Sequence, residues 1–176
     1  MAEAISNFVR QRCGPGTSFN VGMIHGGIGV NVIPKEATIE VDLRSVSLEA
    51  LEGLHERLTR AMRESASVSG LQLQIESMGE RPLGRTTESS ELVQAAVETT
   101  RCLGTNAQIN AASTDANLPM SLGIPAIALG AGGMGGGTHT PEEWFDPTGR
   151  DVGLQRLLAL VAVQAGFAPL RGATFL

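Results

Sequence analysis

A glycine-rich segment that leads to a single histidine is the part of this 176-residue chain best suited to chemistry. Gly135, Gly136 and Gly137 precede Thr138 and His139, soon after an apolar run. A neutral imidazole is a common ligand for divalent metals, and successive glycines are typical of backbone that approaches another group closely. A catalytic zinc, however, takes about three protein ligands, and the residues around His139 do not supply the others. The alternative is a loop histidine that hydrogen-bonds to its own backbone.

The glycines before this histidine also match the spacing of a dinucleotide-binding loop, from Gly130 through Gly132 to Gly135. That function requires a helix to begin at the loop, so that its N-terminus meets a pyrophosphate. Further glycines and then Pro141 follow instead, and they are not compatible with such a helix. No lysine follows the glycines, so the pattern is not a phosphate-binding Walker loop either.

Polar residues elsewhere could bind a substrate. The hydroxyls and carboxylate of residues 113–117 (Ser-Thr-Asp-Ala-Asn) could hold a carboxylate or carbonyl, although the same residue types favour a helix N-cap. Asn31 offers both a donor and an acceptor, or else it caps a turn. Arg44 lies on the polar face of an expected strand, where its guanidinium could grip a carboxylate at two points or simply face solvent.

Composition and charge exclude several classes of function. The net charge is −5 and there is no tyrosine, which disfavours nucleic-acid binding. No apolar run approaches the roughly 20 residues of a membrane span, and residues 1–12 lack the apolar core of a signal peptide. Cys13 and Cys102 are too few and too far apart for a disulfide framework, which favours a reducing compartment. We therefore expect a cytoplasmic protein without nucleic-acid or membrane partners.

The elements of the first half follow from hydrophobic periodicity. The pattern predicts a helix over 2–12, strands over 19–23 and 37–44, a helix from Ser47 to Gly70, and a third strand over 71–75. The strands alternate apolar and polar residues, so one face of the sheet should be covered by helices.

The second half has a different pattern. We expect a linker over 81–87, a helix over 90–103, a short strand over 108–111 and a helical turn over 118–122. An apolar run over 125–129 is typical of a strand buried on both faces of a parallel sheet. A last helix begins near Thr148, and we expect its apolar residues to point inward. The sequence thus predicts two domains, residues 1–82 and residues 83–176.

Taken in order, three motifs resemble the dinuclear-zinc aminoacylase and metallopeptidase family, which includes succinyl-diaminopimelate desuccinylase, acetylornithine deacetylase, glutamate carboxypeptidase and peptidase T. The first runs from Gly26-Gly27 through Asn-Val-Ile-Pro at 31–34 to Asp-Leu-Arg-Ser at 42–45. The second is Ser-Thr-Asp-Ala-Asn at 113–117, and the third is Gly-Thr-His-Thr-Pro-Glu-Glu at 137–143.

The resemblance implies a mixed α+β and α/β fold: a partial ferredoxin-like lid domain, with an antiparallel sheet covered by helices on one face, followed by the C-terminal α/β portion of a catalytic domain. It implies hydrolysis of an amide bond in a small peptide or N-acyl amino acid at a two-zinc centre, and a homodimer formed through the lid. His139 would be the last zinc ligand. Substrate contacts would come from Asn31, Arg44, Thr114, Gly132 and Gly133.

The chain also departs from the family pattern. The His-x-Asp zinc motif, the bridging aspartate and the Glu-Glu pair that includes the general base are characteristic of the family's N-terminal half and do not occur here. We therefore expect the chain to correspond to the C-terminal part of such an enzyme, to be inactive alone, and to depend on the N-terminal half. The alternative is a dimerisation module that binds a small carboxylate without catalysis.

Overall fold

The computed structural model describes residues 5–6, 8 and 13–167. The chain divides into two compact units, Met1–Glu80 and Arg81–Leu176. The helix expected over 2–12 falls largely outside the described residues.

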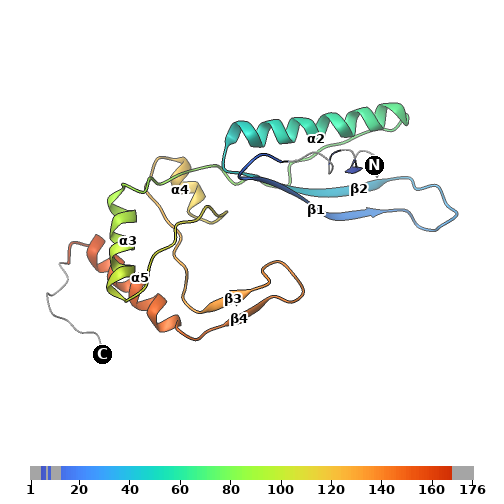
Figure 1. The fold of residues 1–176 in the computed structure, drawn as a ribbon. Helices are drawn as coiled ribbons and strands as arrows, with labels where there is room; N and C mark the ends of the chain where they lie inside the picture. Colours follow the sequence, from blue (N-terminus) through green and yellow to red (C-terminus); the bar gives the residue numbers. More distant parts are fainter. Residues whose placement is uncertain (1–4, 7, 9–12, 168–176) are drawn as a thin grey trace. The chain divides into compact units, whose positions relative to one another are not determined.

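Unit 1 contains a two-stranded antiparallel sheet and a long helix (Figure 1). Strand β1 (Thr17–Gly26) pairs with β2 (Ala37–Ser45), from Thr17 opposite Ser45 to Gly26 opposite Ala37, with an irregularity between Val21 and Met23. Half-buried and exposed residues alternate over 17–21 of β1 and along most of β2, as the period-two pattern predicts, whereas residues 22–26 of β1 are all exposed. Both strands were therefore predicted correctly.

Helix α2 (Leu48–Val68) covers this sheet by packing on β2. Ser47 caps the helix by accepting a hydrogen bond from the Ala50 amide at 3.3 Å, and Glu49 in the first turn complements the helix dipole. Leu54 is only 1% exposed and Met62 is 9% exposed. Phe8 extends the core, with its ring centroid 4.7 Å from that of Phe19.

The third strand expected over 71–75 does not form. Leu71, Leu73 and Ile75 are exposed, and no described strand pairs with this segment. An alternating sequence gives a segment the propensity for a strand, but a strand exists only where a neighbouring edge accepts its hydrogen bonds. In the described part of unit 1 neither edge does so.

Unit 2 is built around two helices that pack on one another, α3 (Glu91–Cys102) and α5 (Arg150–Gln164). Ser90 caps α3 through its hydroxyl, which accepts from the Val93 amide at 3.3 Å. The core of the unit contains Val93 and Ala96 of α3 and Leu160 of α5. A short helix α4 (Asn117–Ser121) and a hairpin of β3 (Met134–Gly136) and β4 (Trp144–Asp146) complete the unit (Figure 1).

The two strands expected in unit 2 over 108–111 and 125–129 do not form either. Segment 124–129 is held by a side chain: the Thr86 hydroxyl donates to the Ala126 carbonyl at 2.6 Å and accepts from the Ala126 amide at 3.0 Å. A strand buried in a parallel sheet needs a neighbour on each side. In the described part of unit 2 no strand pairs with this segment, and the two hydrogen bonds with Thr86 hold it instead.

The last helix forms as expected, but the prediction that its apolar residues point inward is wrong. Five of them are 36–61% exposed: Val152, Leu157, Leu158, Val161 and Val163. Among the described residues, no helix combines the length and apolar character needed to cross a bilayer.

Candidate metal-binding loop

The hairpin that carries His139 is built from glycines covered by aromatic rings. A Cβ on Gly136 would lie 2.7–3.1 Å from atoms of the Trp144 indole, and one on Gly133 would lie 2.7 Å from the Phe145 ring. These rings occupy the space that side chains at positions 133 and 136 would otherwise take. The glycines before the histidine therefore allow close packing of the hairpin, which is the kind of role that the run of successive glycines predicted.

At the tip of the hairpin, the backbone holds His139 in a left-handed conformation, with φ of 66°. It is the only non-glycine residue with positive φ among those described. The turn is closed by hydrogen bonds from the Thr140 amide to the Gly137 carbonyl at 2.9 Å and from the Glu143 amide to the Thr140 carbonyl at 3.1 Å. The carboxylate of Glu143 also accepts from the His139 amide at 3.4 Å. A non-glycine residue in this region is strained, and such strain clusters at functional sites.

His139 is exposed, so its imidazole is accessible to a ligand. Within the described ranges, no group of three or more His, Cys, Asp or Glu side chains is placed to hold a metal ion together. Glu143 belongs to the same turn, but its carboxylate faces the backbone amide of His139. The loop thus presents one nitrogen donor on a fixed backbone.

The base of the loop is fixed to α5 by backbone contact. Gly153, in the first turns of α5, lies so close to the loop that a Cβ there would be 2.3 Å from the Ala131 carbonyl oxygen. Arg156 donates from its guanidinium to the Gly130 carbonyl. Sequence reasoning missed both residues; a glycine inside an otherwise apolar helix was the available signal for the first.

A further anchor lies between the hairpin and α5. The Thr148 amide donates to Asp146 Oδ1 at 2.9 Å. This backbone hydrogen bond, together with one from the Thr148 side chain, lowers the pKa of Asp146 below its usual value. The carboxylate form is therefore the one that supports the turn into α5.

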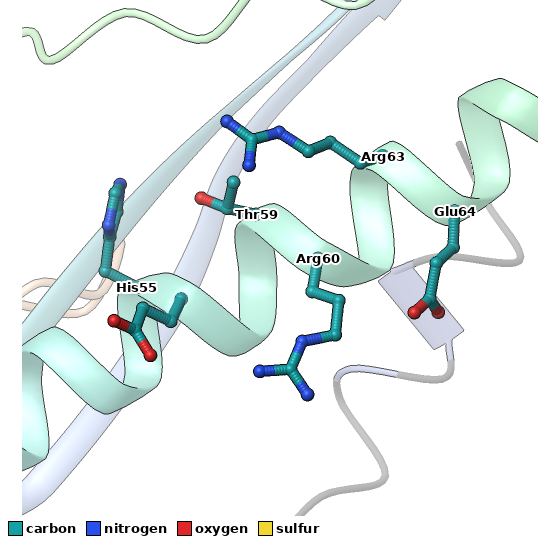
Figure 2. Close-up of a pocket in the computed structure, with 6 residues that line it drawn as sticks. His55, Thr59, Arg60, Arg63 and Glu64 are labelled. Atoms are coloured by element: carbon teal, nitrogen blue, oxygen red, sulfur yellow. The ribbon is translucent and has the colours of Figure 1, made fainter.

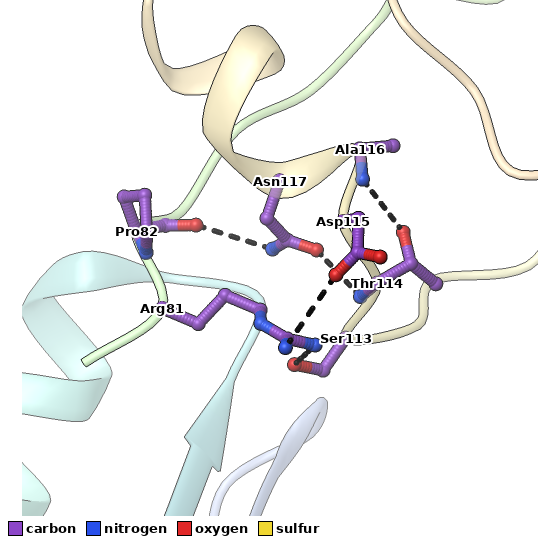
Figure 3. A network of polar contacts seen from close by, with 7 residues as sticks. All are labelled: Arg81, Pro82, Ser113, Thr114, Asp115, Ala116 and Asn117. Atoms are coloured by element: carbon purple, nitrogen blue, oxygen red, sulfur yellow. Dashed lines mark hydrogen bonds and ion pairs between the residues drawn. The ribbon is translucent and has the colours of Figure 1, made fainter. Parts of the chain in front are cut away.

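The Ser-Thr-Asp-Ala-Asn segment forms a hydrogen-bonded turn at the start of α4 (Figure 3). The Thr114 amide donates to Asn117 Oδ1 at 2.8 Å, and the Thr114 hydroxyl accepts from the Ala116 amide at 3.3 Å. These hydrogen bonds hold the turn that precedes α4, whose N-cap residue, Ala116, has no side-chain cap. The role of Thr114 in substrate binding stays a prediction.

The chain just after residue 80 meets this turn. Arg81 donates to the Ser113 hydroxyl at 3.3 Å and lies 3.8 Å from an Asp115 carboxylate oxygen (Figure 3). Asn117 donates to the Pro82 carbonyl at 3.1 Å. These contacts leave the exposed carboxylate of Asp115 only loosely paired.

Asn31 and Arg44 lie at opposite ends of the β1–β2 hairpin. Asn31 is in the connecting loop, which leads into β2 at Ala37. Arg44 is seven residues along β2 from Ala37, or about 23 Å at the rise of an extended strand. Its Nε donates to Asp42 Oδ2 at 2.6 Å, and both side chains are about half exposed. Unit 1 therefore does not bring these two predicted site residues together.

An open groove of about 460 Å³ follows α2 (Figure 2). Its lining consists of side chains from this one helix: His55, Glu56, Thr59, Arg60, Arg63 and Glu64. Because no second element contributes to the lining, the groove does not bring side chains from different elements to converge on a ligand. We do not place a functional site there.

Comparison with known proteins agrees with this description. Residues 1–68 match the family model described as "Peptidase dimerisation domain". The chain is 26% identical over 133 residues to a Bacillus subtilis (strain 168) protein named "Uncharacterized protein YqjE", across 74% of this chain and 36% of that protein.

Two solved structures share the fold. The aminopeptidase PepT from Bacillus cereus superposes with a TM-score of 0.71 at 20% identity, over 93% of this chain and 44% of that one. A tripeptidase from Staphylococcus aureus superposes with a TM-score of 0.75 at 22% identity, over 94% of this chain and 45% of that one. The chain therefore spans less than half the length of the relatives it matches.

These findings confirm the resemblance to the metallopeptidase family, at the level of the fold and of a peptidase dimerisation domain in residues 1–68. The mixed fold class, with small antiparallel sheets and helices, is confirmed as well.

Proposed function

We propose that this chain is the C-terminal part of a zinc-dependent peptidase or amidohydrolase, and that His139 provides one ligand of its metal centre. The observation that carries the proposal is the exposed His139 in a strained, left-handed turn at the tip of a glycine hairpin. The dimerisation-domain match and the shared fold support the choice of reaction class.

The side chain of His139 suits zinc. An imidazole nitrogen suits zinc, and the closed turn fixes the backbone that carries it. One nitrogen does not hold a zinc ion, so the remaining ligands and the general base come from another polypeptide segment. When bound, zinc supplies an activated water and polarises the scissile carbonyl. The chain alone is therefore inactive.

The residues of unit 1 fit a role in substrate binding. Asp42 engages only Nε of Arg44 among the described hydrogen bonds, which leaves the two terminal nitrogens free to grip a carboxylate. Asn31 presents an amide on the connecting loop. We assign both to contacts with a small peptide or N-acyl amino acid. Within unit 2, we assign Thr114, Gly132 and Gly133 to substrate binding. The dimerisation domain makes the assembly a homodimer.

The test is a chimera in which this chain replaces the 45% of the Staphylococcus aureus tripeptidase that it matches. We expect the purified chimera to retain zinc after dialysis, as measured by mass spectrometry, and His139→Ala to lose at least one equivalent. His25→Ala is the matched control, because His25 is also exposed but lies on β1. Equal zinc content in the His139→Ala and unsubstituted chimeras would refute the assignment.

The alternative, a dimerisation module that binds carboxylates without chemistry, makes a different prediction. Such a module binds a dipeptide through Arg44 with no metal present, and its affinity is insensitive to His139→Ala. Calorimetric titration of the chain with a dipeptide, with and without a chelator, separates the two functions.

A further inference from the structure

The loop that leads into β3 has no polar side chain with which to fix itself. Residues 130–133 read Gly-Ala-Gly-Gly, and Gly132 and Gly133 both have a left-handed backbone, with φ of 79° and 80°. Glycine has more backbone freedom to lose on folding than any other residue. Among the described hydrogen bonds between backbone groups of loops and turns, none involves residues 130–132. The loop must therefore be held from outside.

One face of α5 provides that support. Gly153 and Arg156 are three residues apart, so they lie on the same face of the helix. The loop backbone comes close to this face, because a Cβ on Gly132 would lie 2.9 Å from Arg150 Cα and 3.1 Å from the Gly153 amide nitrogen. Arg156 donates from Nη2 to the Gly130 carbonyl. The N-terminal half of α5 thus holds the loop by close backbone packing and by one side-chain hydrogen bond.

The hydrogen bond from Arg156 is the polar part of this arrangement. Arg156 is half-buried, and no carboxylate pairs with it among the described ion pairs. A hydrogen bond from a charged donor is roughly twice as strong as one between neutral groups. Without it, the Gly130 carbonyl would have no partner among the described hydrogen bonds, and the glycines that follow would be free to take other backbone conformations.

We infer that Arg156 is a positioning residue for substrate binding. Acting through the Gly130 carbonyl, it holds the rest of the glycine loop in the conformation that meets the substrate. This inference rests on the proposed function, which assigns Gly132 and Gly133 to substrate binding. It does not extend to the metal, because the turn that carries His139 is closed by its own hydrogen bonds and by the pairing of β3 with β4.

Backbone order in the chain itself tests the first step. Arg156→Met removes the donors but keeps an unbranched side chain. We expect it to lower the NMR order parameters of the amides of residues 130–133 from about 0.85 to below about 0.6, the values typical of rigid and of flexible backbone. Arg156→Lys keeps a donor for the carbonyl and should keep most of the order. Arg101→Met is the matched control, because it removes the same charge from an exposed position of α3.

Kinetics of the chimera described above test the second step. With a tripeptide as substrate, we expect Arg156→Met to raise KM about tenfold while kcat stays within about twofold, since the lost contact serves the ground state and the transition state alike. Zinc content should not change. Arg156→Lys should bring KM back to within about threefold of that of the unsubstituted chimera. A merely structural role predicts instead a lower Tm together with a lower kcat, and no rescue by lysine.

The outcomes separate this inference from the proposed function. An unchanged KM for Arg156→Met, in a chimera that loses zinc on His139→Ala, overturns the inference and leaves the proposed function intact. A raised KM that lysine restores, with zinc content unaffected by His139→Ala, does the reverse. If Arg156→Met does not fold, Arg156→Gln takes its place, since its shorter side chain keeps a polar end that water can hydrate. Unchanged order of the loop in the folded variant, or a chimera that holds zinc but hydrolyses no tripeptide, also overturns the inference.

Discussion

Replacing Gly153 by Ala should destabilise unit 2, although the same change in an ordinary helix is stabilising. Gly153 has no positive φ, so alanine suits its backbone and gains about 1 kcal/mol of helix propensity. Its Cβ, however, would lie 2.3 Å from the Ala131 oxygen, 2.4 Å from the Ala131 carbonyl carbon and 2.6 Å from the Gly132 nitrogen. These are backbone atoms, so no side-chain rotation relieves the overlap.

The magnitude follows from two losses and one gain. Overpacking of this kind costs about 1–3 kcal/mol. A loop pushed away from α5 also loses the hydrogen bond from Arg156 to Gly130, worth about 1 kcal/mol. Set against the propensity gain, the net loss for Gly153→Ala is roughly 1–3 kcal/mol.

Gly53→Ala is the matched control, because Gly53 lies inside α2 and a Cβ there meets nothing within 4 Å. That variant should gain about 0.5–1 kcal/mol. Native-state hydrogen exchange of α5 and α2 gives the opening free energy of each unit separately. Equal or greater protection of α5 in Gly153→Ala would refute the close approach of the loop to the helix.

Two further changes test the contacts around the loop. Thr86→Val removes the hydroxyl that hydrogen-bonds to both backbone groups of Ala126, so the free energy of unfolding of unit 2 should fall by about 1–3 kcal/mol. Urea unfolding followed by circular dichroism measures this loss. A loss no larger than that caused by Thr87→Val, at an exposed position, would count against these hydrogen bonds. Because hydrogen bonds from Thr148 lower the pKa of Asp146, the stabilisation from this carboxylate is present above its unfolded pKa and is lost as the pH falls through the folded pKa, in the acid range. Thr148→Val keeps the amide but removes the hydroxyl, so the pKa of Asp146 followed by NMR should rise part of the way to its usual value; no change would show that the hydroxyl has no role.

The helices were predictable because their signals are local. Ser47 and Ser90 cap α2 and α3, and serine is a residue type that favours this position. The positions of Leu54 and Val93 in the core follow from helical periodicity. The β1–β2 hairpin was predictable for the same reason, since its two strands are neighbours in sequence and alternate in register.

The strands predicted at 71–75 and 125–129 do not form. A strand needs a neighbouring strand to pair with, and a local sequence pattern does not show whether one is present. The same limit applies to α5, whose apolar residues indicate burial but not what buries them. At the candidate site, the sequence indicated the open glycine turn around His139. It did not indicate the left-handed backbone of that residue or the contact of Gly153 with Ala131, because both depend on how the hairpin closes on α5. The role of His139 as a metal ligand stays a prediction.

The packing of Trp144 on Gly136 places an intrinsic fluorophore next to the turn that carries His139. Trp144 is the only tryptophan in the chain, and it is half exposed. Its indole packs against Gly136 of β3, the strand that leads into the histidine turn. A paramagnetic ion such as Cu²⁺ bound at that imidazole should quench its emission, whereas an ion bound elsewhere should not. Occupancy of the turn can therefore be followed by fluorescence, without any label.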